Sequence, residues 1–109
     1  NPAGFISALE TLKNINAQRK ILVTPGMIEL GEKQFELNKD AARNAAEVAD
    51  YVIIVGETNK SALEEGLKEG FAKKVFWAPD LDSAKKKLSE IATTNSAILL
   101  ENDLPDHYF

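Results

Sequence analysis

Four short apolar runs, separated by segments in which apolar residues recur every three or four positions, constrain the fold more than any other feature. Each run is four or five residues long, a length that indicates buried strands rather than helices. Tyr51–Val55 is apolar at every position, which is typical of a strand covered on both faces of a parallel sheet. We therefore predict strands over residues 20–24, 51–55, 74–78 and 97–100.

The intervening segments are predicted to be helices over residues 2–16, 36–49, 59–69 and 80–91. Asn1 before Pro2 is a typical helix start, as is Asp80, and Gly70 is the predicted end of the third helix. The polar stretch 27–35 is predicted to be a loop of nine residues. The residues expected to face the sheet are Phe5, Leu9, Leu12, Ile15, Ala41, Ala42, Ala45, Ala46, Ala49, Ala62, Leu63, Leu67, Leu81, Ala84, Leu88 and Ile91.

The predicted order is α-β-α-β-α-β-α-β, and crossover helices place successive strands parallel to one another. The fold class is accordingly α/β. We expect a three-layer, Rossmann-like domain with a mostly parallel sheet of about four strands, covered by helices on both faces. Residues 1–109 are predicted to form a single domain, and Trp77 in the third strand is expected to belong to its core.

Composition excludes several kinds of site. The chain has no cysteine, which rules out disulfides and thiolate metal ligands and agrees with a cytoplasmic location. Its net charge is -4 and it has no basic stretch, so we expect no nucleic-acid partner. Its longest apolar run is too short to cross a bilayer, so we expect no membrane contact. With neither a signal-like segment nor an initiator methionine before Asn1, we expect a piece of a longer protein.

In open parallel sheets, ligands bind beyond the carboxyl ends of the strands, here residues 24–35, 56–59, 78–80 and 101–106. None of these segments carries a glycine-rich dinucleotide fingerprint or a Gly-Lys-Ser/Thr phosphate loop. His107, Asp103 and Asp106 are interpreted as parts of a solvated acidic tail, so no metal site is predicted. Glu29 lies in the longest of these loops, where a binding role and an ordinary surface role both stay open.

The loop Thr24-Pro25-Gly26-Met27-Ile28-Glu29-Leu30-Gly31-Glu32 resembles the Gly-x-Met-x-Glu-Leu-Gly signature of MurF-type Mur ligases, the UDP-N-acetylmuramoyl-tripeptide–D-alanyl-D-alanine ligases of peptidoglycan synthesis. Asn1-Pro2, followed by Phe5, Ser7, Ala8 and Leu9, is similar to the segment that leads into the C-terminal domain of these enzymes. The remaining pattern fits that C-terminal domain along essentially the whole chain.

The resemblance implies that the chain is the third domain of an ATP-dependent ligase. Such an enzyme activates a substrate carboxylate as an acyl phosphate, which the amine of a dipeptide then attacks. ATP and Mg would be bound mainly by a central domain that this chain lacks, so the isolated chain is expected to be inactive. Its partners would be that domain, the nucleotide-sugar peptide and the dipeptide. The loop residues implied to face these substrates are Gly26, Met27, Glu29, Gly31, Asn38, Glu101, Asn102 and Asp103.

Two departures from the family pattern bear on the substrate. Asn38 stands where many members have a histidine, and Glu101-Asn102-Asp103 replaces a Lys-Gly-Ser segment. An acidic loop favours an ammonium group over a carboxylate, so it is a candidate receiver of the incoming amine. Folylpolyglutamate synthase-like and other amide-forming relatives share the domain. A stand-alone, flavodoxin-like binding or regulatory module is the alternative from a different class.

Overall fold

The structure is a computed structural model that describes residues 1–101. Its elements follow the predicted order and are α1 (Pro2–Asn14), β1 (Arg19–Thr24), the 3-10 turn η1 (Gly31–Lys33), α2 (Gln34–Val48), β2 (Tyr51–Val55), α3 (Lys60–Glu69), β3 (Lys74–Ala78), α4 (Leu81–Ile91) and β4 (Ser96–Leu100). Within these residues, no helix combines the length and apolar character needed to cross a bilayer.

Two predicted boundaries are wrong. The second helix begins at Gln34 and is preceded by η1, so the irregular part of the predicted nine-residue loop is confined to its first residues. The first helix ends at Asn14, and Ile15 beyond it adopts an extended conformation with 43% of its surface exposed. Ile15 therefore does not face the sheet, because the helical period that would have placed it there has already ended.

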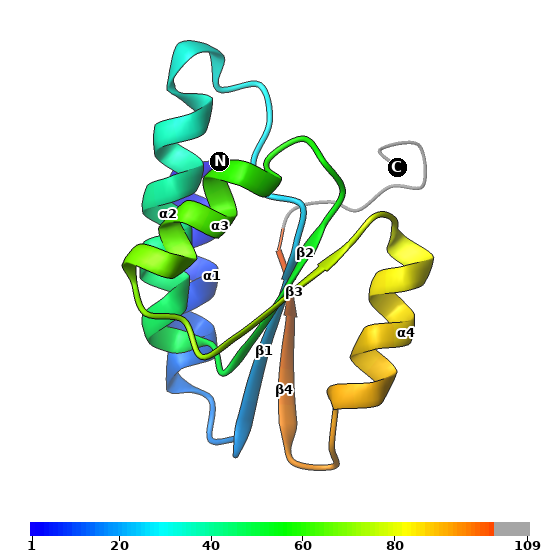
Figure 1. Ribbon diagram of the computed structural model, residues 1–109. Helices are drawn as coiled ribbons and strands as arrows, with labels where there is room; N and C mark the ends of the chain where they lie inside the picture. Colours follow the sequence, from blue (N-terminus) through cyan, green and yellow to red (C-terminus); the bar gives the residue numbers. More distant parts are fainter. Residues whose placement is uncertain (102–109) are drawn as a thin grey trace.

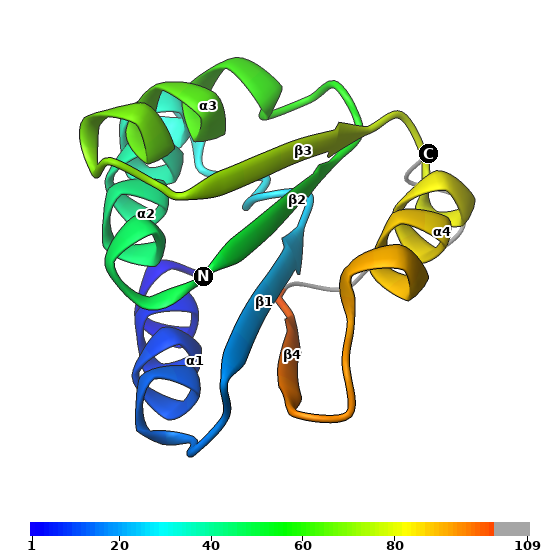
Figure 2. The same cartoon turned by 60° about the horizontal axis from the view of Figure 1, so that its bottom comes forward.

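The four strands form one parallel sheet in the order β3-β2-β1-β4. Helices α1, α2 and α3 lie on one face of the sheet and α4 lies on the other (Figures 1 and 2). The predicted class, an α/β domain with a parallel sheet between helical layers, is confirmed. The chain winds from β1 through β2 to β3 along one face, then crosses through α4 to place β4 on the far side of β1.

Alternating side chains of the central strands separate the core into two layers. Leu22, Val52 and Ile54 pack with α1, α2 and α3, whereas Ile53 and Val55 pack with α4. The outer strands are less covered, and Trp77 on β3 keeps 38% of its surface exposed. The expectation that Trp77 belongs to the core is therefore wrong, because β3 is an edge strand with helix cover only in part.

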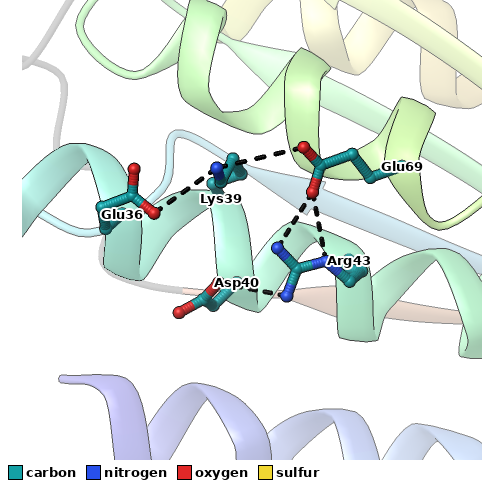
Figure 3. A network of polar contacts seen from close by, with 5 residues as sticks. All are labelled: Glu36, Lys39, Asp40, Arg43 and Glu69. Carbon is teal, nitrogen blue, oxygen red and sulfur yellow. Dashed lines mark hydrogen bonds and ion pairs between the residues drawn. The ribbon is translucent and has the colours of Figure 1, made fainter.

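Helices α2 and α3 approach each other closely through small residues. Gly66 packs against the Lys39 carbonyl and the Ala42 side chain, and Gly70 packs against the Ala46 side chain. Outside this contact, the Glu69 carboxylate on α3 accepts hydrogen bonds from the Arg43 guanidinium on α2 (Figure 3). These bonds raise the pKa of Arg43 above its ordinary value. Because the pair is exposed, its contribution to the free energy of folding is small beside that of the helix contact.

Predicted caps begin two of the helices. The Asn1 side-chain oxygen accepts a hydrogen bond from Gly4 N at 2.7 Å, and the Asp80 carboxylate accepts one from Ser83 N at 2.8 Å. Gly70 is the C-cap of α3, as predicted, but its φ is negative. The left-handed conformation falls on the next residue, Phe71, with φ 58°. Gly70 is therefore required by the helix contact rather than by a left-handed turn.

The Asp80 cap predicts a pH-dependent stability. The hydrogen bond from Ser83 lowers the pKa of Asp80 in the folded chain, so its stabilising effect is complete above the unfolded pKa and is lost as the pH falls through the folded value. Asp80→Ala should lower Tm at neutral pH and differ less from the parent in acid. Asp80→Asn, which caps without titrating, should retain Tm at neutral pH. Thermal unfolding followed by circular dichroism measures both effects, and a pH-independent Asp80→Ala deficit would contradict the expectation.

Candidate functional site

The switch point of the sheet lies between β1 and β4, because the chain winds away from β1 in one direction and returns on its other side. In parallel sheets, ligands bind beyond the carboxyl ends of the strands at such a point. The segments there are the loop 25–30 after β1 and Glu101 after β4. The 25–30 loop lies near the top of the view in Figure 1, next to the connection between β2 and α3. Two separately predicted ligand segments thus meet at one place.

Thr24 joins these two segments. The residue is 1% exposed, and its hydroxyl donates to the Glu101 carbonyl at 3.0 Å and accepts from Gly26 N at 3.0 Å. The Glu101 backbone N–H donates in turn to the Val23 carbonyl at 3.1 Å. Gly26 turns the chain away from β1 with φ 81°, a conformation that glycine adopts without strain. The beginning of the 25–30 loop is therefore fixed to the end of β4.

Met27 and Asn38, two of the predicted ligand-facing residues, are buried. Met27 packs in the core layer under α1, α2 and α3, and Asn38 on α2 is 0% exposed. The Asn38 side chain bonds both backbone groups of Met27, accepting from its N–H at 2.7 Å and donating to its carbonyl at 3.0 Å. In this structure both side chains stabilise the conformation of the loop, and neither contributes to its exposed surface.

Glu29 and Gly31 lie on the exposed side of the loop. Glu29 has φ 62°, a left-handed conformation that is unfavourable for any residue with a Cβ atom. Gly31, with φ 62°, has no atom near the position that a Cβ would occupy. Glu29 and its neighbour Ile28, 37% exposed, are the exposed residues of the 25–30 loop. A residue with a strained backbone and an exposed carboxylate, at the edge where ligands bind, is a candidate functional residue.

Glu101 supplies a second carboxylate at this edge. Burial raises the pKa of the Glu101 carboxyl above its ordinary value. Of the acidic segment predicted to receive an amine, only Glu101 is described. Asn102 and Asp103 lie outside the described residues, as do Asp106 and His107.

Asn59, which is not among the predicted site residues, also contacts the loop. It lies between β2 and α3, is 4% exposed, and donates to the carbonyls of Pro25 and Met27, each at 3.0 Å. It is the last residue of the 56–59 segment, which the sequence places beyond the carboxyl end of a strand, and this position is the sequence signal that points to it.

The side chains at this edge that are not fully buried include the carboxylates of Glu29 and Glu101. The Thr24 hydroxyl and the amides of Asn38 and Asn59 are buried and bonded to the loop backbone. Among residues 1–101, no cluster of three histidine or acidic side chains could hold a metal ion. The arrangement can attract and orient a substrate that is cationic or that donates hydrogen bonds. Bond-making chemistry of the ligase type needs in addition a phosphate loop, which the sequence lacks.

One comparison with known proteins agrees with the sequence resemblance to the C-terminal domain of a Mur ligase. The family model described as Mur ligase, glutamate ligase domain, matches residues 1–101. Neither the curated proteins nor the solved structures yielded a match to the chain.

Proposed function

The chain belongs to the Mur ligase, glutamate ligase domain family, and from this premise we propose that it is the C-terminal, substrate-binding and closing domain of a longer ATP-dependent amide ligase. The ligase acts in the cytoplasm in the synthesis of a peptidoglycan precursor. ATP and Mg are bound mainly by the central domain of that ligase, and the present domain closes over them. Closure excludes water, which would otherwise hydrolyse the acyl phosphate before the amine reaches it.

The reaction that we propose is the MurF type. The carboxylate of a UDP-MurNAc-peptide takes the terminal phosphate of ATP, and ADP leaves. A D-Ala-D-Ala-like amine then attacks the acyl carbon, forms the new C–N bond and loses a proton as phosphate leaves. The observation that carries this proposal is the position of the Met27–Gly31 motif at the switch point of the sheet, with Glu29 exposed. Glu29 and Glu101 supply negative charge that favours an incoming ammonium group.

We expect the isolated 109-residue chain to hydrolyse no ATP, and the full-length ligase to consume ATP only when both the nucleotide peptide and an amine are present. The physical reason is that no phosphate loop is present in the chain. Phosphate release measures ATP consumption by the isolated chain and by the full-length ligase, and mass spectrometry detects the amide product. ATP turnover by the isolated chain would contradict the domain assignment. A full-length enzyme that accepts glutamate but not D-Ala-D-Ala would overturn the MurF-type reaction while leaving the ligase proposal intact.

A further inference from the structure

Three side-chain amides, those of Gln34, Asn38 and Asn59, hold the backbone of the 25–30 loop, and we refer to them as the amide clamp. Asn38 makes the two bonds to Met27 described above. Its Nδ2 atom also lies 2.8 Å from the Gln34 carbonyl and 3.3 Å from Asn59 Oδ1. Asn59 Oδ1 also accepts from Gln34 Nε2 at 3.0 Å. Gln34 Oε1 faces Leu30 N at 3.5 Å. The clamp therefore connects α2, the start of α3 and both ends of the loop.

The loop passes so close to the clamp that only glycine fits at position 26. A Cβ atom on Gly26 would lie 2.7 Å from Asn38 Oδ1 and 2.8 Å from Asn59 Nδ2. Every buried side-chain nitrogen and oxygen among residues 1–101 has a hydrogen-bond partner, so the clamp is fully satisfied. A satisfied buried network allows one backbone arrangement and penalises others, because displacement would leave buried polar groups unpaired.

The burial of polar residues in this domain is concentrated at this loop. Among the described residues, the buried polar side chains are Thr24, Asn38 and Asn59, and all three bond the loop backbone at its beginning. Apolar side chains of similar size would fill the same space without the cost of burying an amide. The polar groups are therefore explained by the backbone conformation that they hold rather than by packing alone.

We propose that Asn38, Asn59 and Gln34 are positioning residues that hold Glu29 in place at the switch point for the ligase reaction. The proposal rests on the proposed function for its activity readout. The clamp binds the loop at Pro25, Met27 and Leu30, so the short stretch that includes Glu29 is fixed on both sides. This tethering accounts for the left-handed conformation of Glu29, which the loop would relax if it were free.

The test compares three variants. Asn38→Asp keeps the acceptor for Met27 N but replaces the donor with a carboxylate that faces the carbonyls of Met27 and Gln34. Gln34→Met removes the half-buried side-chain amide that bonds Leu30 N and Asn59 Oδ1, and it keeps a side chain of similar shape. Asn44→Asp, on the exposed side of the same helix, is the matched control for the added charge.

In the 109-residue chain, amide hydrogen exchange at residues 27–30 should be roughly tenfold or more faster in Asn38→Asp and Gln34→Met, while the β2 amides stay protected. In the full-length ligase, kcat should fall roughly tenfold or more with KM for ATP unchanged, as expected for a misplaced group. Protonation of the carboxyl group introduced by Asn38→Asp restores a donor, so the activity of this variant relative to the parent should recover as the pH is lowered.

Exchange and kcat equal to those of the parent in Gln34→Met would overturn the proposal, as would an Asn38→Asp variant whose relative activity does not depend on pH. If Asn38→Asp does not fold, Gln34→Met decides the question alone. A full-length protein without ligase activity would contradict the proposed function, and the exchange measurement would still decide whether the clamp holds the loop.

Discussion

Gly66→Ala is expected to destabilise the domain by about 3 kcal/mol or more, the largest stability effect that we expect from a single added methyl group. The new Cβ atom would lie 2.1 Å from the Lys39 carbonyl oxygen and 2.8 Å from the Ala42 Cβ. Helix propensity acts in the opposite direction, because alanine is favoured over glycine inside a helix by about 1 kcal/mol. The steric effect dominates, since a backbone carbonyl in α2 cannot turn away as a flexible side chain can.

Thermal and urea unfolding measure this effect, and a loss of about 3 kcal/mol corresponds to a fall in Tm of roughly 10 to 20 °C. Gly4→Ala is the matched control, because Gly4 also lies in a helix but its added Cβ would meet only the Asn1 side chain, at 3.2 Å. We expect Gly4→Ala to leave Tm unchanged or slightly raised. A Gly66→Ala variant as stable as Gly4→Ala would mean that α2 and α3 do not approach each other as described.

Replacing Glu29 is expected to have the largest effect on activity. Glu29→Gln should lower kcat/KM of the full-length ligase roughly tenfold to hundredfold, because a charge-assisted interaction with the substrate is lost. The exposed side chain makes no packing contribution, so the free energy of unfolding should change by less than about 0.5 kcal/mol. Glu29→Gly removes the same carboxylate and also relieves the left-handed backbone, so it should raise stability by up to about 1 kcal/mol while activity falls.

Phe71→Gly is the control that separates backbone relief from loss of function. Phe71 is 89% exposed, has φ 58°, and lies between α3 and β3 at the opposite, amino edge of the sheet. We expect this variant to be at least as stable as the parent and fully active. Steady-state kinetics and thermal unfolding, measured on the same preparations, compare Glu29→Gly with Phe71→Gly. If Glu29→Gln unfolds the domain and spares turnover, Glu29 has a structural role and the site assignment is wrong.

The sequence by itself determined the fold class and most of the core. The apolar run Tyr51–Val55 predicted a parallel strand buried on both faces, and the alanine spacing of the second helix correctly predicted its buried face. Both signals depend on the periodicity of one segment, which its own residues define. The loop after the first strand was predicted to lie at the ligand edge, because the carboxyl ends of parallel strands all meet there. The resemblance to the Met-x-Glu-Leu-Gly motif singled out the same loop. The role of Glu29 in that loop stays a prediction.

Only the tertiary structure decided which loops meet and how closely. Strand order placed Glu101 beside the 25–30 loop, although more than seventy residues separate them. Asn38 shares the helical period of Ala41, Ala42 and Ala45, so its burial could have been read from spacing, but not its bonds to Met27 and Asn59. The close approach at Gly66 is of the same kind. It arises from contacts between two helices distant in sequence, and local periodicity carries no information about such contacts.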